Sequence, residues 1–150
     1  MPEVFRIAEK IDNRNDLTTI ILNNKEYLSE STDGGSELIG YLQKNKIIKI
    51  KSTISLSYGL QTQYFYFDSS NLFYVKEIIE VFPYSDSLGT FNYTKLEINF
   101  IGDYIFNNNK LIDLESLGHN RFEDDKIDIE KTLIEEMGKS KLLIENKINQ

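Results

Sequence analysis

The residues best suited to chemistry are a single histidine and a set of carboxylates near the end of the chain. His119 is the one histidine among 150 residues, and it lies in the polar stretch GHNR. The chain has no cysteine, which excludes thiolate catalysis, disulfides and cysteine-based zinc sites. One histidine with carboxylates is a thin ligand set for zinc, and no GxSxG, HExxH or kinase motif occurs. We therefore interpret His119 as a surface-loop residue and expect a protein that is not an enzyme.

An acidic cluster follows the histidine and resembles a calcium-binding composition. It comprises Glu123, Asp124, Asp125, Asp128 and Glu130. Calcium prefers oxygen ligands, but the spacing of an EF-hand loop is missing. Acidic residues also favour the positive N-terminal end of a helix. The sequence thus indicates a helix start with Asp125 or Asp128 as its cap, and it predicts neither a metal nor a cofactor.

Composition and charge narrow the class of partner. The chain carries a net charge of −7, which disfavours binding to the phosphate backbone of nucleic acids and suits a basic protein partner. Its length fits one domain, residues 1–150. No apolar run approaches the ~20 residues of a transmembrane helix. We therefore expect a protein partner, with no nucleic acid and no transmembrane segment, and the oligomeric state stays open.

The stretch Gln61–Phe82, QTQYFYFDSSNLFYVKEIIEVF, organises the chain. Two runs rich in Tyr, Phe, Val and Ile flank a short polar segment, which is typical of a β-hairpin. The same frame recurs at Leu42–Ile50 and Phe106–Leu114: an apolar residue, four polar residues, then apolar, apolar, any and apolar. This repetition predicts a common hairpin loop length and a sheet of consecutive antiparallel strands.

Helical patterns bound this run of strands. Pro2–Asn13 and Lys126–Lys147 carry apolar residues at helical spacing, with Leu133, Met137 and Ile144 on the stripe that should dock on the sheet. Gly138 should weaken the second helix by about 1 kcal/mol relative to Ala and marks a candidate break. The sequence predicts an α+β fold: an antiparallel meander of about six strands, a short N-terminal helix, and a longer C-terminal helix packed on the sheet.

The central strands are apolar on both faces, and this predicts an interaction surface. One long and one short helix are available as cover, so we expect aromatic area to stay open, as at many interaction sites. The alternative is that sheet curl or the long loop Pro83–Lys95 covers these side chains. The expected surface lies either on the sheet face or on this rim loop. The sheet-face residues, which simple alternation places together, are Phe65, Phe67, Tyr74 and Tyr104, and the rim-loop residues are Tyr84 and Tyr93.

The runs GGSELIGY, KIIKI, QYFYFDSSNLFYV and DYIFNNNKLID resemble a family of uncharacterised small exported bacterial proteins with repeated aromatic hairpins and Asn-rich turns. The resemblance covers Ser31–Ser116 and carries no catalytic residue. It implies a periplasmic or secreted protein from which a leader has been removed. Met1-Pro2-Glu3 itself lacks the basic and apolar regions of a secretory signal, so a cytoplasmic location stays an alternative.

Three functions are compatible with these patterns. The first is a non-enzymatic binding or interaction module of the periplasm or cell envelope, which rests on the meander and the missing catalytic motifs. The second is an acidic immunity or inhibitor protein that neutralises a basic toxin or enzyme. The third is a protein that binds a small ligand under a curled sheet.

Overall fold

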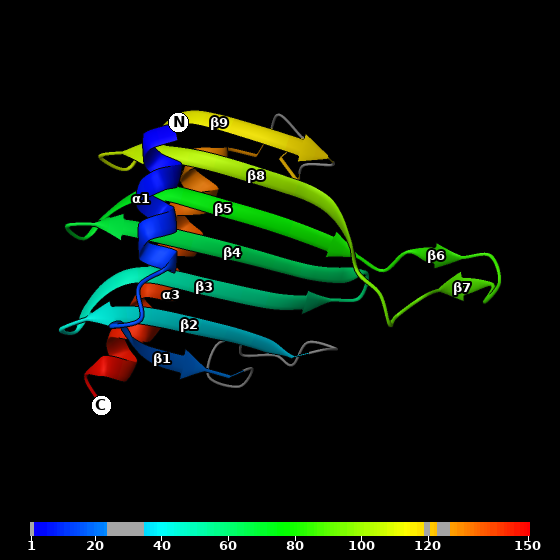
Figure 1. Ribbon diagram of the computed structural model, residues 1–150, viewed down its shortest axis with the longest axis horizontal. Coiled ribbons are helices and arrows are strands. Elements are labelled where there is room, and N and C mark those ends of the chain that lie inside the picture. Colours follow the sequence, from blue (N-terminus) through cyan, green and yellow to red (C-terminus); the bar gives the residue numbers. More distant parts are fainter. Residues whose placement is uncertain (1, 24–34, 119–120, 123–126) are drawn as a thin grey trace.

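The computed structural model describes residues 2–23, 35–118, 121–122 and 127–150 and shows an α+β arrangement in which one large antiparallel sheet has a helix on each face (Figure 1). The sheet has seven strands where the sequence predicted about six, and they follow chain order as a meander. Within the described residues, no helix is long and apolar enough to cross a membrane. The strands are β1 (Thr18–Leu22), β2 (Ser36–Gln43), β3 (Lys46–Leu56), β4 (Gly59–Asp68), β5 (Asn71–Val81), β8 (Glu97–Asn107) and β9 (Lys110–Gly118).

The three predicted hairpins share one geometry. In each, two central turn residues have positive φ, and the pairs are Lys44-Asn45, Ser69-Ser70 and Asn108-Asn109. Positive φ at both positions defines the type I′ turn, whose twist matches that of the flanking strands. The common loop length is therefore confirmed, and all three turns lie at the same end of the sheet (Figure 1).

A β-bulge directly after each of these turns changes which residues share a face. In β4–β5, Phe67 pairs with Leu72 but Tyr66 pairs with Tyr74, so Phe73 is an extra residue in β5. The alternation of β5 shifts by one position there. Tyr74 consequently lies with Tyr66 on the opposite face from Phe67, which corrects the sequence-based assignment of Tyr74 to the Phe67 face.

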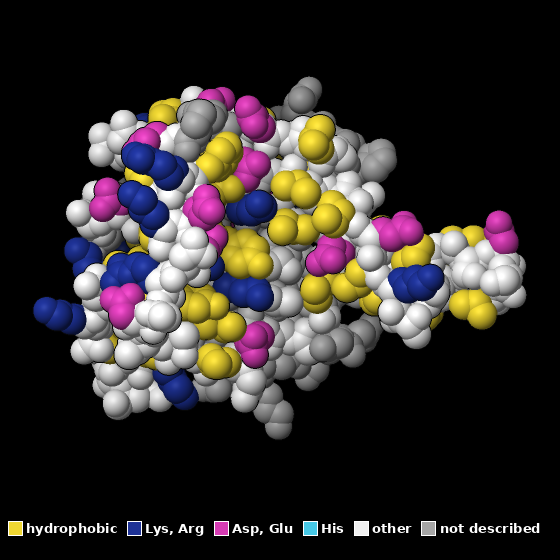
Figure 2. All heavy atoms as spheres, viewed as in Figure 1, with side chains coloured by type: hydrophobic (Ala, Val, Ile, Leu, Met, Phe, Trp, Pro, Cys, Tyr) yellow, Lys and Arg dark blue, Asp and Glu magenta, His cyan; other side chains and the backbone are white. Residues whose placement is uncertain are grey.

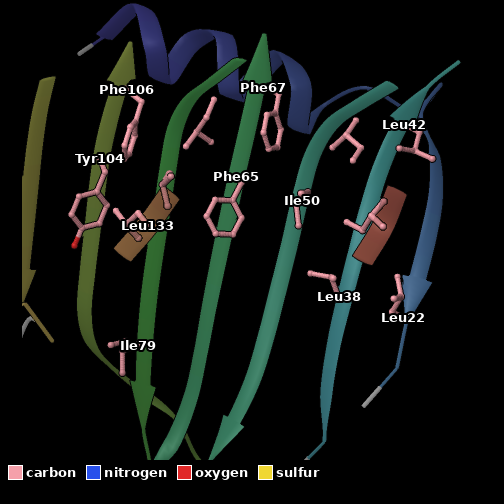
Figure 3. Close-up of a cluster of buried hydrophobic side chains, with 14 of the residues drawn as sticks. Leu22, Leu38, Leu42, Ile50, Phe65, Phe67, Ile79, Tyr104, Phe106 and Leu133 are labelled. Carbon is pink, nitrogen blue, oxygen red and sulfur yellow. The ribbon is translucent and has the colours of Figure 1, made fainter. Parts of the chain in front are cut away.

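The main core lies between the sheet and α3 (Ile129–Ile148), on the face that carries Phe65 and Phe67 (Figure 3). Leu133 and Ile144 of α3 are fully buried in it, and Met137 packs at its margin. Docking of α3 through these three residues confirms the prediction. Gly40 in β2 permits the close approach of α3, because a Cβ there would come within 2.8 Å of Ile144.

Helix α3 begins as the sequence indicated and does not break at its glycine. Asp128 is the N-cap, and its Oδ1 accepts a hydrogen bond from the Lys131 backbone N–H at 3.0 Å. The helix continues through Gly138, which corrects the expected break. The intact helix is explained by its buried residues on both sides of Gly138, since tertiary packing outweighs the propensity cost of one glycine. His119 and residues 123–125 lie outside the described residues.

The second, smaller core lies under α1 (Pro2–Asp12) on the other face. Ala8 packs there with Tyr66, Tyr74 and Ile105. At the end of α1, Asp12 Oδ1 accepts a hydrogen bond from Tyr66 Oη at 2.9 Å and lies 2.6 Å from Lys49 Nζ. Burial and this carboxylate raise the pKa of Tyr66, so its hydroxyl stays a donor. These contacts fix the C-terminal end of α1 on the sheet.

The turn geometry yields a stability prediction at Ser70, whose φ is 70°. Left-handed backbone costs an L-residue about 1–2 kcal/mol, and glycine largely avoids this cost. After allowing for the greater unfolded-state entropy of glycine, we expect Ser70→Gly to stabilise the protein by roughly 0.5–1 kcal/mol in urea unfolding. Ser116→Gly, in the extended strand β9, is the control and should destabilise by a similar amount. Equal shifts in the same direction would contradict the turn assignment.

Candidate functional site: an open sheet face and an aromatic ribbon

Helix α1 covers only one end of its sheet face. It crosses the strands near the end that carries the three hairpin turns (Figure 1). Because α1 crosses the strands, it covers only about its own width of 10–12 Å along them, whereas β5 and β8, each of 11 residues, are about 37 Å long. Most of the length of these strands on this face is therefore beyond α1.

Three cross-strand rows follow the residues under α1, and cross-strand partners share a face. The row next to α1 is Lys51, Tyr64, Lys76, Asp103 and Glu115. The second row is Thr53, Thr62, Ile78, Ile101 and Leu117. The third row is Ser55, Leu60, Glu80 and Ile98.

The second and third rows leave aliphatic side chains in contact with solvent. Ile98 is 62% exposed and Leu117 is 77% exposed. Leu60, Ile78 and Ile101 beside them are half-buried. We call these five residues the open face, and Figure 2 shows hydrophobic side chains gathered between α1 and the projecting ribbon. An apolar sheet face without a covering layer is typical of an interaction site.

A two-stranded ribbon projects from the sheet between β5 and β8 (Figure 1). It contains β6 (Tyr84–Ser85) and β7 (Thr90–Phe91), in which Tyr84 pairs with Phe91. Four rings follow one another along it with centroids 5.0 to 6.5 Å apart, and we call them the aromatic ladder. They are Phe82, Tyr93, Phe91 and Tyr84. Three of them are at least half exposed, so the ladder is a surface feature rather than a core.

A hollow joins the aromatic ladder to the open face. It has a volume of about 440 Å³, and its lining includes Leu60 from the open face and Phe82 and Tyr93 from the ladder. Leu96, which is also exposed, lies in the same lining. The two apolar surfaces are therefore continuous.

The row next to α1 carries lysines on one side and carboxylates on the other. Lys51 lies on β3 and Lys76 on β5, where Lys76 pairs directly with Asp103 of β8, and Asp103 in turn pairs with Glu115 of β9. Tyr74 Oη donates a hydrogen bond to Asp103, and burial together with this bond raises the pKa of Tyr74. A second hollow of about 430 Å³ lies against this acidic end, between the carboxylates and the apolar side chains of Ile101 and Leu117.

A separate polar network lies under α3. The fully buried Glu77 Oε1 accepts a hydrogen bond from Gln61 Nε2 at 2.7 Å and lies 2.9 Å from Arg121 Nε. Arg121 Nη2 also contacts Glu136 Oε1 at 2.6 Å. Burial raises the pKa of Glu77, while Arg121 and Gln61 oppose that shift. Because Arg121 links Glu77 of β5 to Glu136 of α3, we interpret this network as an anchor for α3 and not as a reactive site.

The predicted interaction residues divide into two groups. Tyr84 and Tyr93, on the rim loop, are exposed as expected. The sheet-face part of the prediction is wrong, because the remaining four side chains are buried by the two helices. Phe65, Phe67 and Tyr104 are covered by α3, and Tyr74 is covered by α1.

The aliphatic residues of the open face are not among those that the sequence predicted. The available signal was the shortness of the N-terminal helix, which correctly predicted incomplete cover. Predicting that Ile98 lies on the partly covered face also requires the bulge at Asn99. This bulge places Ile98 opposite Glu80 while Phe100 stays opposite Ile79. Simple alternation puts Ile98 on the face of Phe100 instead.

Comparisons with known proteins assign neither a family nor a function to this chain. No family model, curated protein or solved structure matches the chain. The resemblance to exported hairpin proteins therefore stays an expectation.

Proposed function

We propose that this protein is a non-enzymatic interaction module that binds a protein partner through the open face and the aromatic ladder. The observation that carries the proposal is the continuity of an uncovered aliphatic sheet face with exposed aromatic rings on a projecting ribbon. Tyrosine suits such a role because its ring can be buried while its hydroxyl stays hydrogen-bonded, and it is enriched among the residues that dominate binding energy.

Two features favour a protein over other polymers. Glu80, Asp86 and Glu97 outnumber Lys95 around the ribbon, whereas single-stranded nucleic acids need a basic groove beside their stacking rings. Adjacent ladder rings are inclined by 56° to 87°. They form an irregular surface suited to protein side chains and not a flat platform for stacked rings.

Two structural observations concern the alternatives of metal binding and of a ligand held under the sheet. Among the described residues, no group of three or more histidine, cysteine or acidic side chains could hold a metal ion. The face under α3 is filled by core side chains (Figure 3). The filled core supports an interaction module over a protein with a ligand under a curled sheet, and the net charge of −7 keeps an acidic inhibitor as the second candidate.

Site-specific photo-cross-linking in the native cell tests this proposal. A photoreactive amino acid in place of Tyr93 or Ile98 should give a discrete cross-linked product, because both side chains are exposed at the proposed surface. Leu142, which is exposed on α3, is the matched control position and should not give that product. Identical products from all three positions, or none from Tyr93 and Ile98, would contradict the proposal.

Substitutions at the same surface give an independent measurement. Phe91→Ser and Ile98→Ser are each introduced into the protein that carries the photoreactive amino acid at position 93. Each should lower the yield of the cross-linked product at least several-fold, since apolar anchors dominate interface energies. Both side chains are at least half exposed, so the melting temperature should stay close to that of the parent protein. Leu142→Ser should leave capture unchanged.

A further inference from the structure

We infer that the open face receives an amphipathic α-helix of the partner, laid across the strands beside α1, with an arginine or lysine over Asp103 and Glu115. This inference rests on the proposed function and specifies the chemistry of the partner. It joins three observations: the space beside α1, the aliphatic rows, and the acidic end of the charged row.

The space beside α1 has the dimensions of a helix. An α-helix with side chains is about 10–12 Å wide. Rows on one face of a strand recur every second residue, about 7 Å apart, so the three rows beside α1 span about 14 Å. A helix in this place would continue the layer that α1 begins across β4, β5 and β8 (Figure 1).

A helix fits this surface better than an extended strand. An added strand gains its affinity from backbone hydrogen bonds at the edge of a sheet. The open face belongs to β4, β5, β8 and β9, and the first three of these strands are paired on both sides. An amphipathic helix satisfies its own backbone and needs only an apolar surface for its apolar stripe.

The acidic end of the charged row specifies the flank of that helix. Asp103 and Glu115 are directly opposite each other on β8 and β9, and like charges in that arrangement repel. Asp103 accepts a hydrogen bond from Tyr74 on the same face and has Lys76 as its cross-strand partner on β5. Glu115, on the edge strand β9, pairs only with Asp103. A cationic side chain of the partner beside Glu115 would relieve the repulsion from the solvent side.

The hollow at this position matches an arginine or lysine side chain. Its walls combine the aliphatic Ile101 and Leu117 with the carboxylates of Asp103 and Glu115. Long basic side chains bury an aliphatic stem against apolar surface and keep the charged end with polar groups. Arginine in addition can bind carboxylates through two parallel hydrogen bonds. Lys76, next to Asp103 in the row, and Lys51 beyond it would repel a basic residue placed over β3 to β5, so the row also orients the helix.

A synthetic helical peptide can take the place of the partner helix in a direct test. The probe carries a leucine stripe flanked by arginines, and its control carries glutamates at the arginine positions. In NMR titrations of the full-length ¹⁵N-labelled protein, the arginine peptide should shift resonances of Ile78, Ile101, Glu115 and Leu117. It should bind at least about tenfold more tightly than the glutamate peptide, the ratio expected from one charge-assisted contact.

Charge variants make the assignment specific to the acidic end. Asp103→Asn combined with Glu115→Gln should weaken the arginine peptide about tenfold, and Glu115→Arg should reverse the preference toward the glutamate peptide. Glu135→Gln combined with Glu145→Gln removes the same charge from exposed positions of α3 and should leave the affinity unchanged. Melting temperatures of all variants show whether the fold is retained.

Several results would overturn this inference. They are equal affinity for the two peptides, resonance shifts confined to other surfaces, and absence of binding at millimolar peptide. If cross-linking from Tyr93 and Ile98 nevertheless captures a partner, only the basic helix is withdrawn. If those positions capture nothing, the proposed interaction module itself is withdrawn.

Discussion

Leu133→Ala is expected to lower the free energy of unfolding by about 2–5 kcal/mol, the range for truncating a buried leucine. The Leu133 side chain is fully buried between α3 and the sheet. Its removal leaves a cavity in the core that α3 closes, and the rigid sheet below can collapse only in part. Urea unfolding monitored by circular dichroism gives the difference directly.

Leu142 supplies the control on the same helix. It is 59% exposed, so Leu142→Ala should change the free energy of unfolding by no more than about 0.5 kcal/mol. Both substitutions exchange leucine for a strong helix former, and helix propensity therefore nearly cancels in the comparison. Equal effects at the two positions would show that α3 does not dock through Leu133.

The fold could be predicted because its signals are local in the sequence. The polar segments QKNK, DSSN and NNNK each specify a hairpin, and consecutive hairpins leave little choice of topology. The stripe of α3 and its Asp128 cap are equally local, since both depend on residues within a few turns of one helix. The additional ribbon within Pro83–Lys95 was expected only as a loop, because its paired segments are just two residues long.

The faces of the strands could not be predicted as reliably, because each bulge shifts the alternation by one residue. The bulge after Ser69-Ser70 moved Tyr74 to the face of α1. The bulge at Asn99 moved Ile98 to the same face. A bulge depends on how a strand fits its neighbour, and the sequence of one strand alone carries no clear sign of it.

The sequence predicted that one sheet face would be partly open, but it did not predict which residues lie on the open part. Counting the available helices correctly indicated that one sheet face would lack full cover. Aromatic side chains were expected to remain open, but Phe65 and Tyr104 occupy the best-covered central positions and are fully buried. The uncovered part is aliphatic because α1 crosses the aromatic end of the sheet, a placement that depends on contacts such as those of Asp12 with Tyr66 and Lys49.

Arg121→Met is expected to lower the free energy of unfolding by about 3–5 kcal/mol at pH 7, the range for breaking a buried ion pair by removing one partner. Glu77 is fully buried, and Arg121 Nε lies 2.9 Å from its Oε1. Methionine retains much of the arginine stem but no charge. The variant must therefore bury the Glu77 carboxylate without its cation or protonate it.

The effect should depend on pH in a defined direction. Burial raises the pKa of Glu77 above its ordinary value of 4.5. Between these two pKa values the folded state holds a proton that the unfolded state has lost, so stability falls as pH rises from about 4.5 through the folded-state pKa. Arg121 opposes the rise in the pKa of Glu77. Its loss therefore widens the pH range over which the variant loses stability. The destabilisation should be largest at pH 7 and should shrink as pH approaches 4.5.

A second substitution separates the charge from the packing of Arg121. Glu77→Gln in the Arg121→Met background removes the unpaired carboxylate and keeps a side chain that can hydrogen-bond to Gln61, so it should restore most of the lost stability at pH 7. Arg121 also lies over the Phe122 ring at 4.4 Å. A loss that is the same at pH 5 and pH 7 and is not rescued by Glu77→Gln would assign the contribution of Arg121 to this packing, because that contact does not depend on the charge of Glu77.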